Sequence, residues 1–411
     1  MSQKEKLLLF VLACLNFTHI MDFMILMPLG PQLMRYFGIS PQQFSLLVST
    51  YSFSAGVSGF CVAFIADRFP RKHLIMIAYT GFVVGTLACA MAPTFGTLLL
   101  ARTVAGLFGG VLGAQVMAAV SDTFVYERRA QAMGVVMTAF SVASVAGVPT
   151  GLYLASVWSW HAPFWFVGGL GMLVIALIYW FVPRLDDHLK DRGQTTHKPF
   201  EVLTTILKTP NQLRALWLTT TIMLGHFSII PFISPYLVAN VGFSEQNIFL
   251  IYAVGGALTL FTSPQVGKLA DKRGKYPVFV VFALLSMIPM WLITNLNTNS
   301  LPLILGAAGL FFVFSNGRLI PTQAMTASVV LPQQRGGFLA INTSLQLLMQ
   351  SLAVYWAGLI IERQPSGKLL HYNWVGYGAM AFIFVSIFIA RAIKPVDTQL
   401  QPELTPEAAA K

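Results

Sequence analysis

Twelve long apolar stretches constrain this chain more than any other feature of its sequence. A helix that crosses the roughly 30 Å hydrocarbon core of a bilayer needs about 20 mostly apolar residues. Only 10% of the 411 residues are charged, whereas a soluble domain carries about 25%. We therefore predict transmembrane helices near residues 7–29, 45–66, 74–92, 97–120, 132–154, 163–182, 213–236, 247–267, 277–295, 301–325, 337–361 and 372–393.

The continuity of these stretches predicts an all-α membrane protein. Strands of a membrane β-barrel alternate apolar and polar residues over about 10 residues, and these stretches do not. The first stretch follows Lys4 and Lys6, as a signal peptide would, but it runs past Cys14 to Pro28. We therefore expect it to remain as a helix. The three cysteines all lie in predicted helices and indicate no disulfide framework.

The positive charges predict which side of the membrane each loop faces. Of the 26 Lys and Arg, only Arg35, Arg363 and Lys368 fall in the predicted external loops, and Arg102 and Arg318 fall inside helices. All the others lie on the side of the termini, and basic loops stay in the cytoplasm. We expect a multi-pass protein of the bacterial inner membrane with both termini cytoplasmic. The net charge of +11 then reflects topology and contact with anionic lipids rather than nucleic-acid binding.

One long polar loop divides the chain into two halves. We predict a six-helix bundle at 1–182, a cytoplasmic loop at 183–212, a second six-helix bundle at 213–394 and a cytoplasmic tail at 395–411. Within the loop, a stretch near 200–207 is expected to form a short surface helix.

The two halves repeat each other at an offset of 204 residues. Gly38 matches Gly242, and Pro31 matches Pro235. In this register Asp22 of the first helix corresponds to His226 of the seventh. Internal repeats of this kind build many secondary transporters, in which the substrate site lies between the halves near the membrane midplane.

A loop motif occurs at matched positions in both halves. The eighth helix ends in Gly267-Lys-Leu-Ala-Asp-Lys-Arg-Gly-Lys275, and the second ends in Ala63-Phe-Ile-Ala-Asp-Arg-Phe-Pro-Arg-Lys72. This resembles the signature loop of the major facilitator superfamily, although Ala63 and Pro70 replace the usual glycines. The resemblance covers about residues 7–393 and implies two pseudo-symmetric six-helix bundles. It also implies that these loops latch the cytoplasmic side, through Asp67, Arg68, Arg71, Gly267, Asp271, Lys272 and Gly274.

Two further motifs resemble the drug:proton antiporter branch of this superfamily, which includes arabinose- and sugar-efflux permeases. Arg102 in the fourth helix is followed by a run of glycines. The fifth helix holds Gly147-Val-Pro-Thr-Gly151, a variant of the antiporter motif with Val148 inserted before Pro149. Gly147, Pro149 and Gly151 are therefore expected to serve helix packing in an antiporter-like motif.

Asp22 is the acid that we place deep in a predicted helix. Charged residues inside a membrane are costly and usually face a cavity or a partner. A carboxyl group that alternates between two environments can bind a proton on one side and release it on the other. We interpret Asp22 as a proton-coupling group, Arg102 as its partner at similar depth and His19, one turn earlier, as a relay. The alternatives are a permanent structural ion pair, helix-packing hydrogen bonds and a neutral core histidine.

Polar residues in other helices are candidates for a substrate cavity. His226 is expected there because it matches Asp22 in the repeat. Arg318 lies about 25 Å along its helix, so that snorkelling to the cytoplasmic surface is its simplest role and an anion-attracting vestibule the alternative. The candidate cavity residues are His226, Asn16, Gln115, Asn342, Gln346, Tyr355 and Arg318; other intramembrane polar residues are Ser141, Ser144, Asn316, Gln323 and Gln350.

These features predict a monomeric secondary transporter that exports a small organic molecule in exchange for protons by alternating access. No Walker loop is present, which argues against ATP-driven transport. No nucleophile triad or metal-ligand cluster is evident, so we expect neither an enzyme nor a cofactor. Proton-independent or symport uptake, and a membrane receptor that does not transport, are the alternatives. The sequence does not identify the substrate.

Overall fold

The computed structural model describes every residue except 1, 64, 184, 186–198, 332–334 and 397–411. Within these residues, twelve helical stretches are long and apolar enough to cross a membrane, which confirms the predicted all-α membrane fold. Large apolar side chains lie exposed on the outer surface, Phe261 and Trp180 at 70% each. Such a surface is stable only against lipid.

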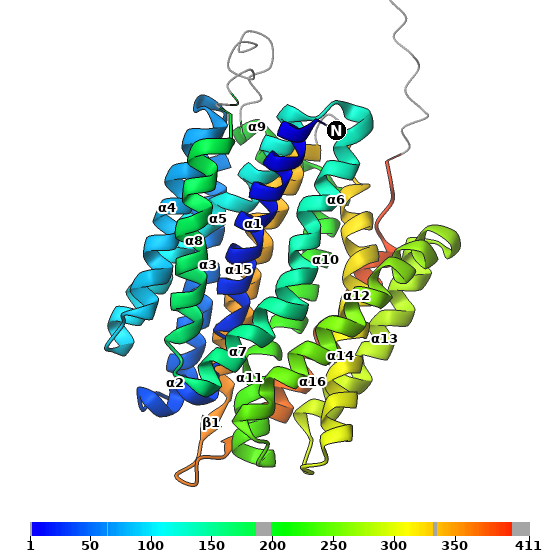
Figure 1. Ribbon diagram of the computed structural model, residues 1–411. Coiled ribbons are helices and arrows are strands. Elements are labelled where there is room, and N and C mark those ends of the chain that lie inside the picture. The colour runs from blue at the N-terminus through cyan, green and yellow to red at the C-terminus, as the bar shows by residue number, and fades with distance from the viewer. Residues whose placement is uncertain (1, 64, 184, 186–198, 332–334, 397–411) are drawn as a thin grey trace, which may run out of the picture.

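The first half contains six membrane-crossing helical stretches, one of them interrupted (Figure 1). A short helix, α2, continues the first stretch after a turn, and a π-helical turn, η2, interrupts the fifth. The elements are α1 (Gln3–Ile25), α2 (Gly30–Tyr36), α3 (Pro41–Ala63), η1 (Ala66–Arg68), α4 (Arg71–Ala90), α5 (Phe95–Thr123), α6 (Tyr126–Val142), η2 (Ala143–Gly147), α7 (Val148–Val157) and α8 (Ala162–Phe181).

The second half follows the same plan. The short helix expected near residues 200–207 is present as α9 (Pro199–Lys208). The remaining elements are α10 (Pro210–Phe227), α11 (Ile230–Tyr236), η4 (Leu237–Val241), η5 (Glu245–Asn247), α12 (Ile248–Arg273), α13 (Lys275–Thr294), α14 (Leu301–Ala327), α15 (Arg335–Ile360), the hairpin strands β1 (Glu362–Arg363) and β2 (Leu369–Leu370), and α16 (Tyr372–Arg391).

Local sequence signals explain where several helices begin and turn. Ser2 and Thr94 cap α1 and α5 with reciprocal capping boxes, which satisfy backbone donors at the helix start. Gly38 and Gly242 both adopt a positive φ, of 62° and 75°. They stand 204 residues apart, so the repeat seen in the sequence is also a repeat of backbone conformation.

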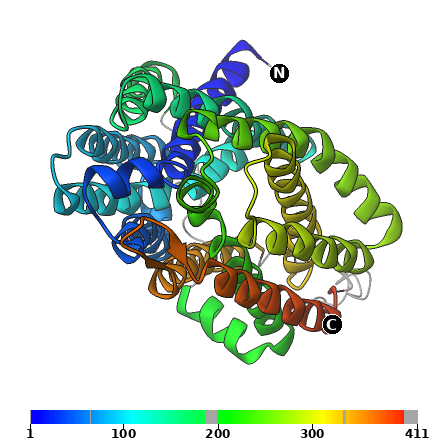
Figure 2. The ribbon, with the colours of Figure 1, turned by 90° about the horizontal axis from the view of Figure 1, so that it is seen from below.

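The two halves lie side by side, the first from blue to teal and the second from green to red (Figure 2). α3 of the first half packs along α15 of the second. The face that carries the start of α1 and α9 is called the terminal face, and the face with α2, α11 and the hairpin is called the opposite face (Figure 1).

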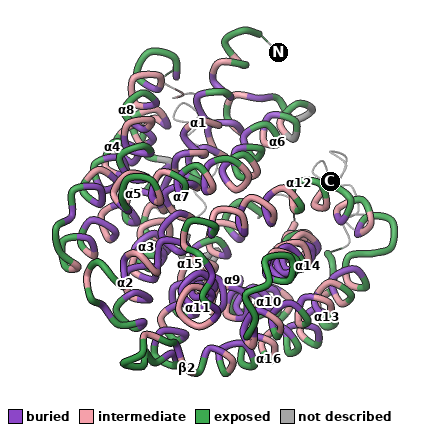
Figure 3. Tube along the Cα trace, turned by 60° about the horizontal axis from the view of Figure 1, so that its bottom comes forward, coloured by how far each residue is buried: buried purple, intermediate pink, exposed green. Residues whose placement is uncertain are grey.

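The core that the two halves share takes its first-half residues from the opposite face. That shared core takes residues 25–48, 89–101 and 148–164 from the first half and much of the second half. Toward the terminal face, the first half has a separate core, in residues 8–15, 51–83, 105–136 and 174–182. Buried segments accordingly gather around α3, α11 and α15 (Figure 3). The described residues are therefore joined across the halves at the opposite face and packed mainly within each half at the terminal face.

Candidate functional site

A buried ion pair lies inside the first bundle, between α1, α4 and α5. Nη1 of Arg102 donates to Oδ2 of Asp22 at 2.8 Å, and Oγ1 of Thr86 donates to Oδ1 of the same carboxylate at 3.1 Å. The Asp22 and Arg102 side chains are 0% and 1% exposed. The sequence placed the two residues at similar depth, and the structure brings them into contact. Their charges cancel inside the membrane, which is how intramembrane charges are normally tolerated.

Two donors beside this ion pair have no acceptor among the described residues. The guanidinium of Arg102 lies 4.3 Å from the ring centroid of Tyr51. Nε of Arg102 and the hydroxyl of Tyr51 are both buried without a hydrogen-bond partner. Buried polar atoms are rarely left unpaired. These two donors can therefore bind an additional hydrogen-bond acceptor next to the Asp22 carboxylate. Sequence reasoning missed Tyr51 and Thr86, because hydroxyl-bearing residues occur throughout these helices.

The glycines that follow Arg102 let α5 pack directly on neighbouring helices. A Cβ on Gly106 would lie 2.1 Å from Oγ of Ser54 on α3, which is too close for any side chain. A Cβ on Gly109 would lie 2.6 Å from the hydroxyl of Tyr51 and 3.1 Å from Nε2 of His19. The motif thus holds Tyr51 and His19 against α5, one or two turns from the ion pair.

His19 lies one turn before Asp22 on α1 and packs edge-to-face on Phe82 at 5.5 Å. Among the described residues, its ring makes no hydrogen bond to Asp22 or Arg102. A direct proton relay is thus not assembled in this conformation, and the expected role of His19 stays a prediction.

The fifth-helix motif, residues 147–151, packs against α1. Its first glycine, Gly147, ends the π-helical turn η2, and Pro149 occupies the first turn of α7. A Cβ on Gly151 would lie 2.7 Å from Cδ1 of Ile25, so a larger residue would have to displace that side chain of α1. Gly256 of α12 packs on η2 in the same manner, with its Cβ position 2.9 Å from the carbonyl oxygen of Ser144. The motif therefore lies where the two halves meet.

A second buried arginine lies in the second bundle. Arg318 is 0% exposed. Its Nη1 donates to Oγ of Ser286 on α13, and its Nη2 lies 3.4 Å from Nδ1 of His226 on α10. The expected snorkelling of Arg318 to the membrane surface is wrong, because the side chain turns inward to these two polar partners.

Three of the expected cavity residues are packed inside their own half. Asn16 donates to the carbonyl of Val136 at 3.4 Å, and Asn342 accepts from Oγ1 of Thr219 at 2.8 Å. Gln115 is 4% exposed, and its Oε1 has no hydrogen-bond partner. All three are covered in this conformation, so their assignment to a substrate cavity remains a prediction.

The other cavity candidates lie on α15, beside the first half. Gln346 and Tyr355 are half-buried there. On the same helix, Nε2 of Gln350 donates to Oγ of Ser52 on α3 at 3.0 Å, which links the two halves inside the membrane.

The loop after the second helix is tied to its own half. Nε of Arg71 donates to Oδ2 of Asp122, at the end of α5, at 3.0 Å. Arg68 is exposed. Asp67 belongs to η1, but its side chain lies outside the described part of the structure.

The matching loop after the eighth helix is exposed. Asp271 and Lys272 are exposed at the end of α12, and Gly274 turns the chain with a φ of 93°. This positive φ is one that glycine adopts without strain. A Cβ on Gly267 would meet nothing within 4 Å in this conformation. Neither loop joins the two halves through an ion pair among the described residues.

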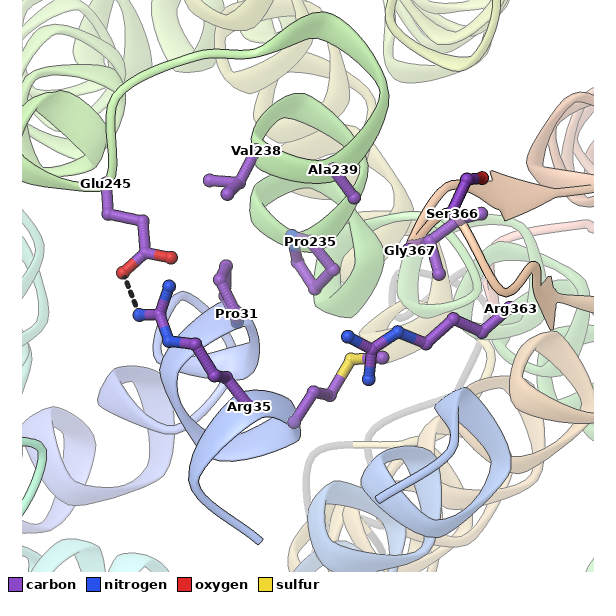
Figure 4. Close-up of a pocket in the computed structure, with 11 residues that line it drawn as sticks. Pro31, Arg35, Pro235, Val238, Ala239, Glu245, Arg363, Ser366 and Gly367 are labelled. Carbon is purple, nitrogen blue, oxygen red and sulfur yellow. Dashed lines mark hydrogen bonds and ion pairs between the residues drawn. The ribbon is translucent and has the colours of Figure 1, made fainter. Parts of the chain in front are cut away.

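An ion pair instead joins the halves at the opposite face. Nη2 of Arg35, on α2, donates to Oε2 of Glu245, at the start of η5, at 2.6 Å. This hydrogen bond raises the pKa of Arg35. Beside the pair is a hollow of about 190 Å³ that Pro31, Pro235 and Arg363 also line (Figure 4). The repeat-related prolines thus flank a contact that closes the opposite face.

Comparison with known proteins agrees with this architecture. The Major Facilitator Superfamily model matches residues 12–354 and 215–410. The uncharacterized transporter YceJ of Bacillus subtilis is 24% identical over 370 residues, which is 90% of each chain. A probable sugar efflux transporter of Helicobacter pylori is 24% identical over 243 residues, which is 59% of this chain and 60% of the relative.

Solved structures share the fold. A D-xylose-proton symporter superposes with a TM-score of 0.77 at 16% identity, covering 95% of this chain and 99% of the symporter. A bacterial homolog of the human lysosomal transporter Spinster, in an inward-facing and occupied conformation, gives a TM-score of 0.74 at 15% identity. The latter covers 96% of this chain and 97% of the homolog.

Proposed function

Because this chain belongs to the major facilitator superfamily, a family of membrane transporters, we propose that it exports a small organic molecule in exchange for protons. The protein is a multi-pass membrane protein with twelve candidate spans. Export agrees with the similarity to proteins named as probable sugar efflux transporters. The fifth-helix motif, which resembles that of antiporters, points the same way.

We assign the terminal face to the cytoplasm, because the basic residues concentrate there. The shared core and the Arg35–Glu245 pair then close the external side, while toward the cytoplasmic side the first half has a core that is largely its own. In this assignment the conformation faces inward, ready to take up a molecule from the cytoplasm. The transporter works as a monomer, since one chain contains both halves.

The buried pair of Asp22 and Arg102 supports proton coupling more than any other feature. Asp22 carries its charge while Arg102 lies 2.8 Å away. A proton that binds Asp22 from the outside removes the attraction between the two side chains and releases Arg102. The helices can then rearrange, and the proton leaves toward the cytoplasm. One proton that enters down a potential of 100 mV supplies about 2.3 kcal/mol.

Everted membrane vesicles with a pH-sensitive dye test the proposal. Energised vesicles with the wild type, Asp22→Asn or Glu362→Gln receive sugars, drugs, amino acids and organic acids in turn. Glu362 is an exposed acid of β1, so its variant is a control for loss of a carboxylate. We expect at least one compound to dissipate the pH gradient with the wild type and Glu362→Gln, but not with Asp22→Asn. Transport that persists in Asp22→Asn and still depends on the gradient would exclude this mechanism.

A further inference from the structure

Each half holds a buried arginine between a residue of its first helix and a hydroxyl of its third helix. In the first half these partners are Asp22 and Thr86. In the second half, Arg318 contacts His226 and Ser286. Asp22 and His226 are 204 residues apart, which is the offset of the internal repeat. The second site is therefore a counterpart of the first in which a histidine replaces the acid.

This replacement leaves Arg318 without a counter-ion. A guanidinium is always protonated in a protein and only donates hydrogen bonds. Nδ1 of His226 must therefore accept from Arg318, so that the imidazole is neutral and carries its proton on Nε2. Ser286 is neutral as well, and no described acid pairs with Arg318. The first site is neutral as a whole, whereas the second carries one positive charge.

One donor at the second site lacks an acceptor among the described residues. Nε of Arg318 is buried without a hydrogen-bond partner. The Nε2–H group of His226 is a second donor, and His226 is the least covered of the three side chains, at 9% exposed against 0% for both others. The ring of Phe311 stacks on the imidazole, with 6.0 Å between centroids and 7° between planes. The site thus offers one charge, two kinds of N–H donor and an aromatic wall.

We propose that Arg318, His226 and Ser286 bind a carboxylate of the transported molecule. This inference rests on the proposed export function and names the class of its substrate. A guanidinium fork matches the two oxygens of a carboxylate, and a single negative charge cancels the single positive one. Arg318 lies about 25 Å from one end of α14 and about 14 Å from the other. That depth favours a diffusible solute over a lipid headgroup.

Binding to the purified protein in detergent tests this substrate class directly. Isothermal titration would compare lactate, benzoate and gluconate with lactamide, benzamide and gluconamide, which have the same shapes without the charge. We expect at least one acid to bind and its amide not to bind. Arg318→Gln should weaken the binding about 10- to 100-fold, as loss of a charge-assisted hydrogen bond does. Arg318→Lys should recover part of the affinity, and Arg391→Gln, at the exposed end of α16, should leave it unchanged.

Three results would overturn the proposal: none of the acids binds, an amide binds as well as its acid, or Arg318→Gln keeps the affinity of the wild type. The comparison of acid with amide uses the wild type alone, so it holds even if a variant fails to fold. Binding in detergent needs no gradient and can succeed where proton exchange fails. Conversely, proton exchange driven only by neutral compounds would support the proposed function and exclude the carboxylate site.

Discussion

Breaking the Asp22–Arg102 pair from each side separates its structural role from its role in transport. Asp22→Asn leaves Arg102 buried with no counter-ion, because both side chains are almost fully covered. Removal of one partner of a buried ion pair typically costs about 3–5 kcal/mol of stability. Replacing both partners with neutral groups removes that cost. We therefore expect the double variant Asp22→Asn/Arg102→Gln to lie within about 1 kcal/mol of the wild type.

The assay is equilibrium unfolding in detergent micelles, followed by the fluorescence of the eight tryptophans, beside proton-linked transport in vesicles. The double variant should therefore lose far less stability than the sum of the two single variants, which is the sign of strong coupling between the two sites. Transport should be lost in both single variants and in the double variant. Thr86→Val removes only the second hydrogen bond to Asp22, so its loss of stability should be smaller, about 1.5–3 kcal/mol for a hydrogen bond to a charged group.

Two results would refute this reasoning. An unchanged stability of Asp22→Asn would mean that the pair is not formed as described. A double variant that recovers both stability and proton-coupled transport would show that the pair is a purely structural device, and proton coupling would then need another group.

Two further predictions concern closure of the opposite face, measured by the labelling rate of a cysteine at buried Met27 in a background without other cysteines. Gly256→Val forces a side chain against the carbonyl of Ser144, at a cost of about 1–3 kcal/mol. Labelling should then rise about 5- to 150-fold, and Gly169→Ala, which meets no neighbour within 4 Å, should leave it unchanged. Arg35→Glu places two acids together and should raise labelling less than about fivefold, because exposed pairs contribute about 0.2–1 kcal/mol. Exchange of the two charges with Glu245→Arg should restore the slow rate, and failure of that rescue would count against the ion pair as a closing contact.

Hydropathy and residue counting are sufficient to predict the helices of this chain, because burial in lipid demands long apolar runs whatever their neighbours. They also place Asp22 and Arg102 at similar depth. Contact between them depends on how α1 and α5 rotate about their axes, and that rotation follows from packing. Here it is set by glycines such as Gly106 and Gly151, whose missing side chains decide how closely neighbouring helices approach.

The error at Arg318 has a physical cause. Distance from the membrane surface favoured snorkelling of Arg318, but a neutral histidine and a serine on other helices offer closer partners. Nothing in the sequence pointed to Ser286 as a partner of Arg318, because serines within helices usually donate a hydrogen bond to their own backbone. Ser286 does so as well, to the carbonyl of Ala283. Gly267 belongs to a motif that must fit more than one state of a transporter, and a single conformation displays the packing of only one of them.

The charge difference between the halves leads to a prediction about how the membrane potential drives transport. If one proton enters through Asp22 while one carboxylate leaves through Arg318, each cycle moves two positive charges inward. A potential of 100 mV, negative inside, then supplies about 4.6 kcal/mol per cycle, twice the contribution expected for a neutral substrate. In proteoliposomes without a pH gradient, a potassium diffusion potential set with valinomycin should therefore drive carboxylate export. Export should stop when the potential is collapsed and reverse in direction with its sign. Flux that does not depend on the potential would mean that the exchange moves no net charge across the membrane. A one-for-one exchange of proton for carboxylate would then be excluded, even if both sites bind as proposed.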